Sequence, residues 1–166
     1  MTFTESFLQE LERESATTRR MLALVPEDKF DWKPHEKSMS LKQLATHVAE
    51  IPGWLNNVIN ADGLDFGAME YKPHPISSSA ELMDYFEKNL AGGKENLQKT
   101  NDETLINKTW SMRTGDKIHM TDSKLNVVRH CFCQVVHHRA QLGVYLRLLN
   151  IPIPGSYGPS ADDNNF

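Results

Sequence analysis

The sequence has few cysteines, no long apolar run and no excess of positive charge, and these absences exclude several classes of protein. None of its apolar runs is long enough for a transmembrane helix, so we expect no membrane association. Its net charge is −4, and it has no stripe of lysine and arginine. We therefore expect no nucleic-acid partner.

The amino terminus, M-T-F-T-E-S-F-L-Q-E, has an early acidic residue and no apolar segment typical of a signal peptide. Together with a cysteine content of only two, this predicts a cytoplasmic protein in a reducing compartment. On a helix, Cys131 and Cys133 would point roughly 200° apart. In that arrangement they can neither bind one metal ion nor form a disulfide.

What the sequence does contain is apolar residues at helical spacing. The 166 residues are 39% hydrophobic, which suits a single domain over 1–166. The periodicity predicts four helices, at about residues 4–25, after Ser40, after the serines at 77–79, and at about 122–149. We therefore predict an all-α four-helix bundle with long connections and a non-helical C-terminal tail from residue 151.

Some residues should interrupt these elements. Pro52 lies inside the second helix and is expected to kink it, and Gly92 with Gly93 should weaken the second half of the third. The connection before the last helix includes T-W-S-M-R-T-G-D-K-I-H-M. It is compatible with a short hairpin around residues 114–116.

The last helix carries a histidine-rich stretch, N-V-V-R-H-C-F-C-Q-V-V-H-H-R-A-Q-L at 126–142. At about 100° per residue, His138 lies roughly 80° from the centre of the apolar stripe, and Gln134 lies on the same flank. Residues four apart are neighbours on a helix, and this spacing lets two ligands reach one metal ion. At the same angular spacing His137 and His130 point away from the apolar stripe, and we interpret them as solvated surface residues.

A second candidate lies in the second helix. His47 is also about 80° from its own stripe centre, so His47 and His138 can converge between facing helices, where bundles build metal and cofactor sites. The alternative is that each is a partly buried histidine with a structural hydrogen-bond partner.

Arg139 falls about 20° from the stripe centre, where an aliphatic residue is expected. A buried arginine needs a carboxylate or several carbonyls, and Glu14 on the first helix is the candidate partner. The alternative is that the guanidinium reaches solvent at a helix crossing. Trp54 and Tyr145 also have two interpretations: each is either a core residue or part of a ligand-binding pocket.

Three motifs resemble the DinB/YfiT-like superfamily of small four-helix-bundle proteins. They are L-x-x-L-A-T-H-V-A-E-I-P-G-W at 41–54, V-V-H-H-R-A-Q-L-G-V-Y-L-R-L-L at 135–149 and P-G-S-Y-G-P-S-A-D at 154–162. The resemblance implies a divalent metal, with Zn, Ni or Mn as candidates. In the family the metal is held by one histidine of helix two and an H-x-x-x-H pair of helix four, which match His47, Gln134 and His138 here.

Gln134 departs from this pattern, because the family has histidine at that position. An amide oxygen supplies neither charge nor a good nitrogen donor, and hard oxygen ligands suit Mg, Ca and Mn better than Zn. Three outcomes stay open: a weaker site completed by water, a different metal preference, or an empty site.

The resemblance also implies a function, since characterised relatives act on low-molecular-weight thiols, as bacillithiol S-transferases or a mycothiol-dependent isomerase. We therefore expect a metal-dependent thiol S-transferase with a small-molecule substrate and a thiol cosubstrate, which forms a homodimer. The resemblance places Trp54, Arg139 and Tyr145 in the pocket or behind the ligands, and no residue is assigned as the catalytic acid or base. The rival interpretations are a non-catalytic binding bundle with a degenerate site and a metal-dependent hydrolase.

Overall fold

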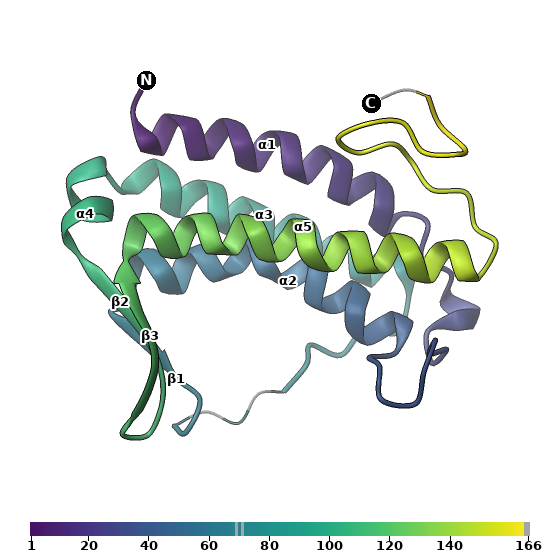
Figure 1. Ribbon diagram of the computed structural model, residues 1–166, viewed down its shortest axis with the longest axis horizontal. Helices are drawn as coiled ribbons and strands as arrows, with labels where there is room; N and C mark the ends of the chain where they lie inside the picture. Colours follow the sequence, from purple (N-terminus) through teal and green to yellow (C-terminus); the bar gives the residue numbers. More distant parts are fainter. Residues whose placement is uncertain (69, 71, 165–166) are drawn as a thin grey trace.

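A computed structural model describes residues 1–68, 70 and 72–164. The long helices run alongside one another, and a small sheet projects from one end of them (Figure 1). In chain order the described elements are α1 (Phe3–Leu22), the 3-10 turn η1 (Glu27–Lys29), α2 (Leu41–Asn60), β1 (Gly63–Asp65), α3 (Ser79–Lys99), α4 (Asp102–Asn107), β2 (Thr109–Thr114), β3 (Lys117–Ser123) and α5 (Lys124–Leu148). None of the described helices is both long and apolar enough to cross a membrane.

The four predicted helices are present as α1, α2, α3 and α5. The all-helical prediction is wrong, because the chain also forms a sheet in the order β1-β2-β3, with β1 parallel and β3 antiparallel to β2. The suggested hairpin is confirmed: β2 and β3 are joined by a tight turn in which Gly115 has a φ of 56°, a conformation that suits glycine. β1 was not predicted from the sequence, because this strand has only three residues and pairs with a distant segment.

Side-chain caps explain where two of the helices begin. Ser40 forms a full capping box with Gln43 at the start of α2, as its position before the apolar stripe predicts. At α3, the Ser78 hydroxyl accepts a hydrogen bond from the Glu81 backbone N–H. The Glu81 carboxylate accepts hydrogen bonds from the backbone N–H and the hydroxyl of Ser77.

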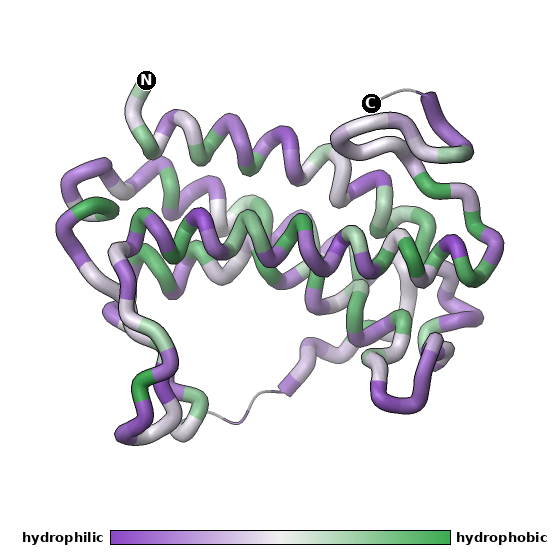
Figure 2. Tube along the Cα trace, in the orientation of Figure 1, coloured by the Kyte–Doolittle hydropathy of each residue, from purple (hydrophilic) through white to green (hydrophobic). Residues whose placement is uncertain are grey.

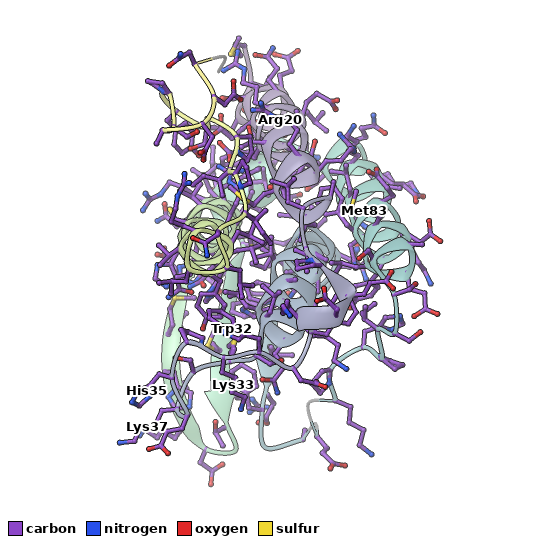
Figure 3. The ribbon with its side chains drawn as sticks, turned by 90° about the vertical axis from the view of Figure 1, so that its right-hand side faces the viewer. Arg20, Trp32, Lys33, His35, Lys37 and Met83 are labelled. Atoms are coloured by element: carbon purple, nitrogen blue, oxygen red, sulfur yellow. The ribbon has the colours of Figure 1, made fainter. Side chains whose placement is uncertain are left out.

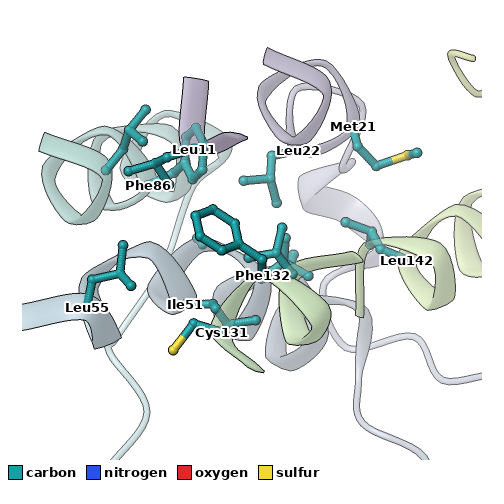
Figure 4. Packing of buried hydrophobic residues seen from close by; sticks show 14 of the residues in the cluster. Leu11, Met21, Leu22, Ile51, Leu55, Phe86, Cys131, Phe132 and Leu142 are labelled. Carbon is teal, nitrogen blue, oxygen red and sulfur yellow. The ribbon is translucent and has the colours of Figure 1, made fainter. Parts of the chain in front are cut away.

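Side chains from α1, α2, α3 and α5 meet in one hydrophobic core. Figure 4 shows Leu22, Ile51, Phe86 and Phe132 pointing toward a common interior from different helices. Along each long helix, hydrophobic segments alternate with hydrophilic ones (Figure 2), as expected for helices that bury one face. This core holds α2 and α5 against each other, which positions the site described below.

The predicted interruptions at Pro52 and Gly93 meet each other in space. α2 continues across Pro52, and α3 continues across both glycines to Lys99. A Cβ added to Gly93 would lie 2.5 Å from the Pro52 carbonyl oxygen, which no real side chain tolerates. Gly93 therefore allows the backbones of α2 and α3 to approach closely at this crossing.

The tail contains no helix or strand over 151–164, as predicted, while residues 165–166 lie outside the described part. It folds back beside the end of α1, where Figure 3 labels Arg20. The Arg20 guanidinium donates to the Gly155 carbonyl at 3.0 Å, and Arg147 pairs with Asp162. Polar contacts to α1 and α5 thus hold the tail in place.

Candidate functional site

Helices α2 and α5 bring His47 and His138 together. The centroids of the two imidazole rings are 4.5 Å apart, and the rings are nearly perpendicular at 79°. Both side chains are partly buried, and the Trp54 ring contacts His47 at 5.3 Å between centroids. The structure therefore places the two predicted histidines side by side between facing helices.

Each histidine is held by an oxygen acceptor three residues further along its helix. His47 Nδ1 lies 2.7 Å from Glu50 Oε1, and His138 Nδ1 lies 2.8 Å from Gln141 Oε1. A carboxylate or amide oxygen cannot donate, so each Nδ1 must carry the proton. In a neutral imidazole the lone pair is then on Nε2. Both rings are thus held so that Nε2 is left to bind a metal ion.

Burial and neighbouring charge favour the neutral form of His138. Burial lowers the pKa of His138, and the nearby His47 and His137 lower it further. Burial also raises the pKa of Tyr85 in α3, and the charge of Glu50 raises it further. The Glu50 carboxylate therefore holds the His47 ring and also acts electrostatically on the Tyr85 phenol.

Gln134 is partly buried, one helical turn from His138, and its amide nitrogen lies 3.2 Å from His130 Nε2. Its amide is thus engaged on the side away from His138. In the described part of the chain, no group of three His, Cys, Asp or Glu side chains is arranged to hold a metal ion. A metal site at the histidine pair would therefore need Gln134, water or substrate to complete it.

A cavity of about 530 Å³ opens beside His47, between α2, the first part of α5 and the sheet. His130 lines this cavity and is partly buried, so its interpretation as a solvated surface residue is wrong. The reason is that the sheet covers this end of α5, and a residue facing away from the helical core then faces the sheet. His137 is exposed, as predicted.

Trp54 and Tyr145, the aromatic residues predicted near the pocket, lie in different places. Trp54 lines the cavity. Tyr145 is not among the described residues that line it: its ring packs edge-on against Trp32 at 5.7 Å, and its hydroxyl donates to the Met39 carbonyl at 3.3 Å. Tyr145 therefore holds the 26–39 connection against α5.

The predicted pairing of Arg139 with Glu14 is confirmed. Arg139 is 3% exposed, and its Nη1 lies 2.6 Å from Glu14 Oε2. The contact is chiefly one of charge, since within the described residues Oε2 has no hydrogen bond. Nη1 also donates to the Glu14 carbonyl and to the Thr18 hydroxyl, each at 3.0 Å. Arg139 thus ties α5 to α1 immediately beside His138.

The tail closes this buried pair. Tyr157 is 66% exposed, yet its hydroxyl donates to Glu14 Oε1 at 2.5 Å and accepts from Arg139 Nη2 at 3.3 Å. Burial of the hydroxyl, and then the Glu14 charge, raise the pKa of Tyr157 to about 12.

Sequence reasoning missed Glu50 and Gln141, although the pattern was readable. Both histidines are followed three residues later by an oxygen acceptor, as H-V-A-E at 47–50 and H-R-A-Q at 138–141. Residues three apart are neighbours on a helix, so this repeated spacing predicts a held tautomer at each ring.

Comparisons with known proteins agree on one family. A family model described as the DinB family matches residues 1–164. Among solved structures, DinB-like proteins from Bacillus subtilis and Bacillus cereus ATCC 10987 each superpose with a TM-score of 0.70, at 16% and 22% identity. These alignments cover 91% of this chain and 96% and 95% of those chains. A structure described as a putative member of the DinB family from Exiguobacterium sibiricum 255-15 has a TM-score of 0.65 at 22% identity, with 93% and 97% of the two chains covered. A comparison with curated proteins found no match. At such identities the three structures show a shared fold.

Proposed function

The chain belongs to the DinB family, and from its paired histidines we propose that it is a divalent-metal-dependent enzyme that transfers groups to the sulfur of a small thiol. The observation that carries the proposal is the placement of the two rings and of the oxygen atoms beside their Nδ1 atoms. His47 and His138 lie together, and each has its Nδ1 proton held by an acceptor. Metal-binding histidines characteristically donate their second ring N–H to such an acceptor.

The donor set fits a weakly held divalent ion. His47 and His138 would supply two imidazole nitrogens, and the amide oxygen of Gln134 is the proposed third ligand. Two nitrogens and one neutral oxygen bind less tightly than three histidines, and the oxygen shifts the preference from Zn toward Mn. When bound, a divalent ion would supply a Lewis acid that lowers the pKa of a coordinated thiol.

The chain's own residues would orient the reactants. Glu50 holds the His47 ring in place, and burial lowers the pKa of His138, which favours the neutral form of that ring. The cavity beside His47 would hold the electrophile and exclude water from it. In the proposed reaction the thiol sulfur bonds to an electrophilic carbon, while the thiol proton and the leaving group are released.

Elemental analysis of the purified, untagged protein tests the metal site, in samples made without chelator and with divalent ions added back. Because the ion is weakly held, we expect near-stoichiometric uptake of a divalent ion once such ions are added back. His138→Ala should lose it with unchanged helicity by circular dichroism, and the exposed neighbour provides the control, since His137→Ala should retain it. Gln134→His should tighten binding. Glu50→Gln should weaken it by about tenfold, because the outer partner of a ligating histidine is worth about 10–100-fold.

Metal loss in His137→Ala but not in His138→Ala would contradict the assignment. If metal is bound, turnover of electrophiles with and without a thiol separates the transferase from a metal-dependent hydrolase.

A second candidate is a binding bundle without metal. The contact between the Gln134 amide and His130 favours it, because that contact engages the amide away from His138. If neither the wild-type protein nor Gln134→His takes up metal after divalent ions are added back, this candidate is supported over the enzyme.

A further inference from the structure

We propose that the cavity beside His47 binds an uncharged, largely apolar small molecule and discriminates against anionic ones. The proposal rests on the proposed function for the chemistry at His47, and it adds the class of molecule that reacts there. The volume of about 530 Å³ lies within the range of roughly 300–1,000 Å³ that is usual for small-molecule sites.

The sheet gives the cavity an apolar floor. Leu64 of β1 pairs with Met112 of β2, and Met112 pairs with Met120 of β3. All three line the cavity, so one row of apolar side chains crosses the whole sheet and faces α2 and α5. Methionine side chains are flexible and adapt to ligands of different shape. The floor is therefore suited to apolar contact with an adaptable fit.

Aromatic side chains extend this apolar surface. Trp54 lies on the α2 side, and Phe66 lines the cavity while being 47% exposed. Trp110 is buried, and its Nε1 donates to Asn57 Oδ1 at 2.9 Å. The indole N–H thus already has a partner, and its ring contributes apolar surface only.

The polar side chains of the lining already have hydrogen-bond partners within the protein. Glu50 is held by His47 and His130 by Gln134, while Asn56 Oδ1 accepts from Asn60 Nδ2 at 2.9 Å. Among the described residues that line the cavity, none is lysine or arginine. In the metal-free protein a ligand carboxylate would therefore lose its water without gaining a cation, and it would face the Glu50 charge, which is costly.

A matched pair of ligands tests this inference without metal. The binding of 1-naphthaleneacetamide and 1-naphthaleneacetate, which are nearly equal in size, would be measured by titration calorimetry of the full chain in EDTA. We expect the amide to bind at least about tenfold more tightly, equivalent to about 1.4 kcal/mol. Equal or tighter binding of the acetate, or no binding of the amide to folded protein, would overturn the proposal.

A variant pair then locates the binding. Met120→Lys puts a cation on the cavity floor and should shift the preference toward the acetate. His119→Lys adds the same charge at the exposed neighbouring position and should leave the ratio unchanged. Equal shifts in both variants would contradict binding in the cavity. If Met120→Lys does not fold, the wild-type ratio still decides.

Metal analysis and ligand titration test the two proposals independently. Amide binding by a protein that takes up no metal would refute the proposed function alone. Metal uptake without amide binding would refute the cavity inference alone.

Discussion

The pair between Glu14 and Arg139 should be strongly coupled, because both side chains are almost completely buried. Glu14 is 5% exposed and Arg139 is 3% exposed. Replacing either by methionine leaves the other charge buried without its partner, at a cost of about 3–5 kcal/mol. For a chain of this length that lowers the melting temperature by about 6–20 °C.

The variant with methionine at both positions should recover most of the lost free energy of unfolding. An apolar pair of similar volume is often neutral in stability relative to a buried ion pair. The double variant should not recover all of the loss, because Arg139 also donates to the Glu14 carbonyl and the Thr18 hydroxyl. The carbonyl keeps its bond from Thr18 at 2.8 Å, so we expect a residual cost of about 1–2 kcal/mol. The coupling energy should then be about 4 kcal/mol or more.

Urea unfolding of the four proteins, followed by circular dichroism, measures this coupling. The exposed pair Arg19 and Glu87, which joins α1 to α3 through two hydrogen bonds, is the matched control. Its coupling should be only about 0–1 kcal/mol. A value below about 0.5 kcal/mol for the buried pair, or equal values for both pairs, would refute the reasoning.

Two further contrasts can be tested on stability and reactivity. Gly92→Ala places a Cβ in open space and should stabilise the protein by about 1 kcal/mol. Gly93→Ala places a Cβ against the Pro52 carbonyl and should destabilise it by about 1–3 kcal/mol. Thermal melts in which Gly93→Ala is the more stable variant would contradict the close crossing of α2 and α3. Burial raises the pKa of Cys131 to about 12, so native protein treated with iodoacetamide at neutral pH should be labelled at the exposed Cys133 alone, and peptide mapping that finds Cys131 modified first would contradict this.

Much of the helical framework was predictable because apolar periodicity is a local property of the chain. The positions of His47 and His138 on the flanks of their helices follow from the same periodicity, and so does the burial of Arg139. The assignment of His47, Gln134 and His138 as metal ligands stays a prediction, because the periodicity places side chains on helix faces without identifying what they bind.

What periodicity could not predict depends on contacts between distant segments. β1 is recognisable as a strand only through its pairing with β2, so the cover over α5 and the burial of His130 were missed. The contact between the rings of Tyr145 and Trp32 could not be predicted either, because it depends on how the 26–39 connection folds back. The placement of Tyr145 near the pocket came from the resemblance alone.

The parallel pairing of β1 with β2 has a consequence for how the protein folds. β1 directly follows α2, while β2 comes only after α3 and α4, so a loop that contains both of these helices must close before the two strands can meet. Contacts between segments far apart in sequence form slowly, because they require a large loop to close first. The cavity floor should therefore be completed late in folding. Its strand amides should also exchange with solvent deuterium sooner than those of the helical core, because short strands at the end of a bundle belong to its least stable part.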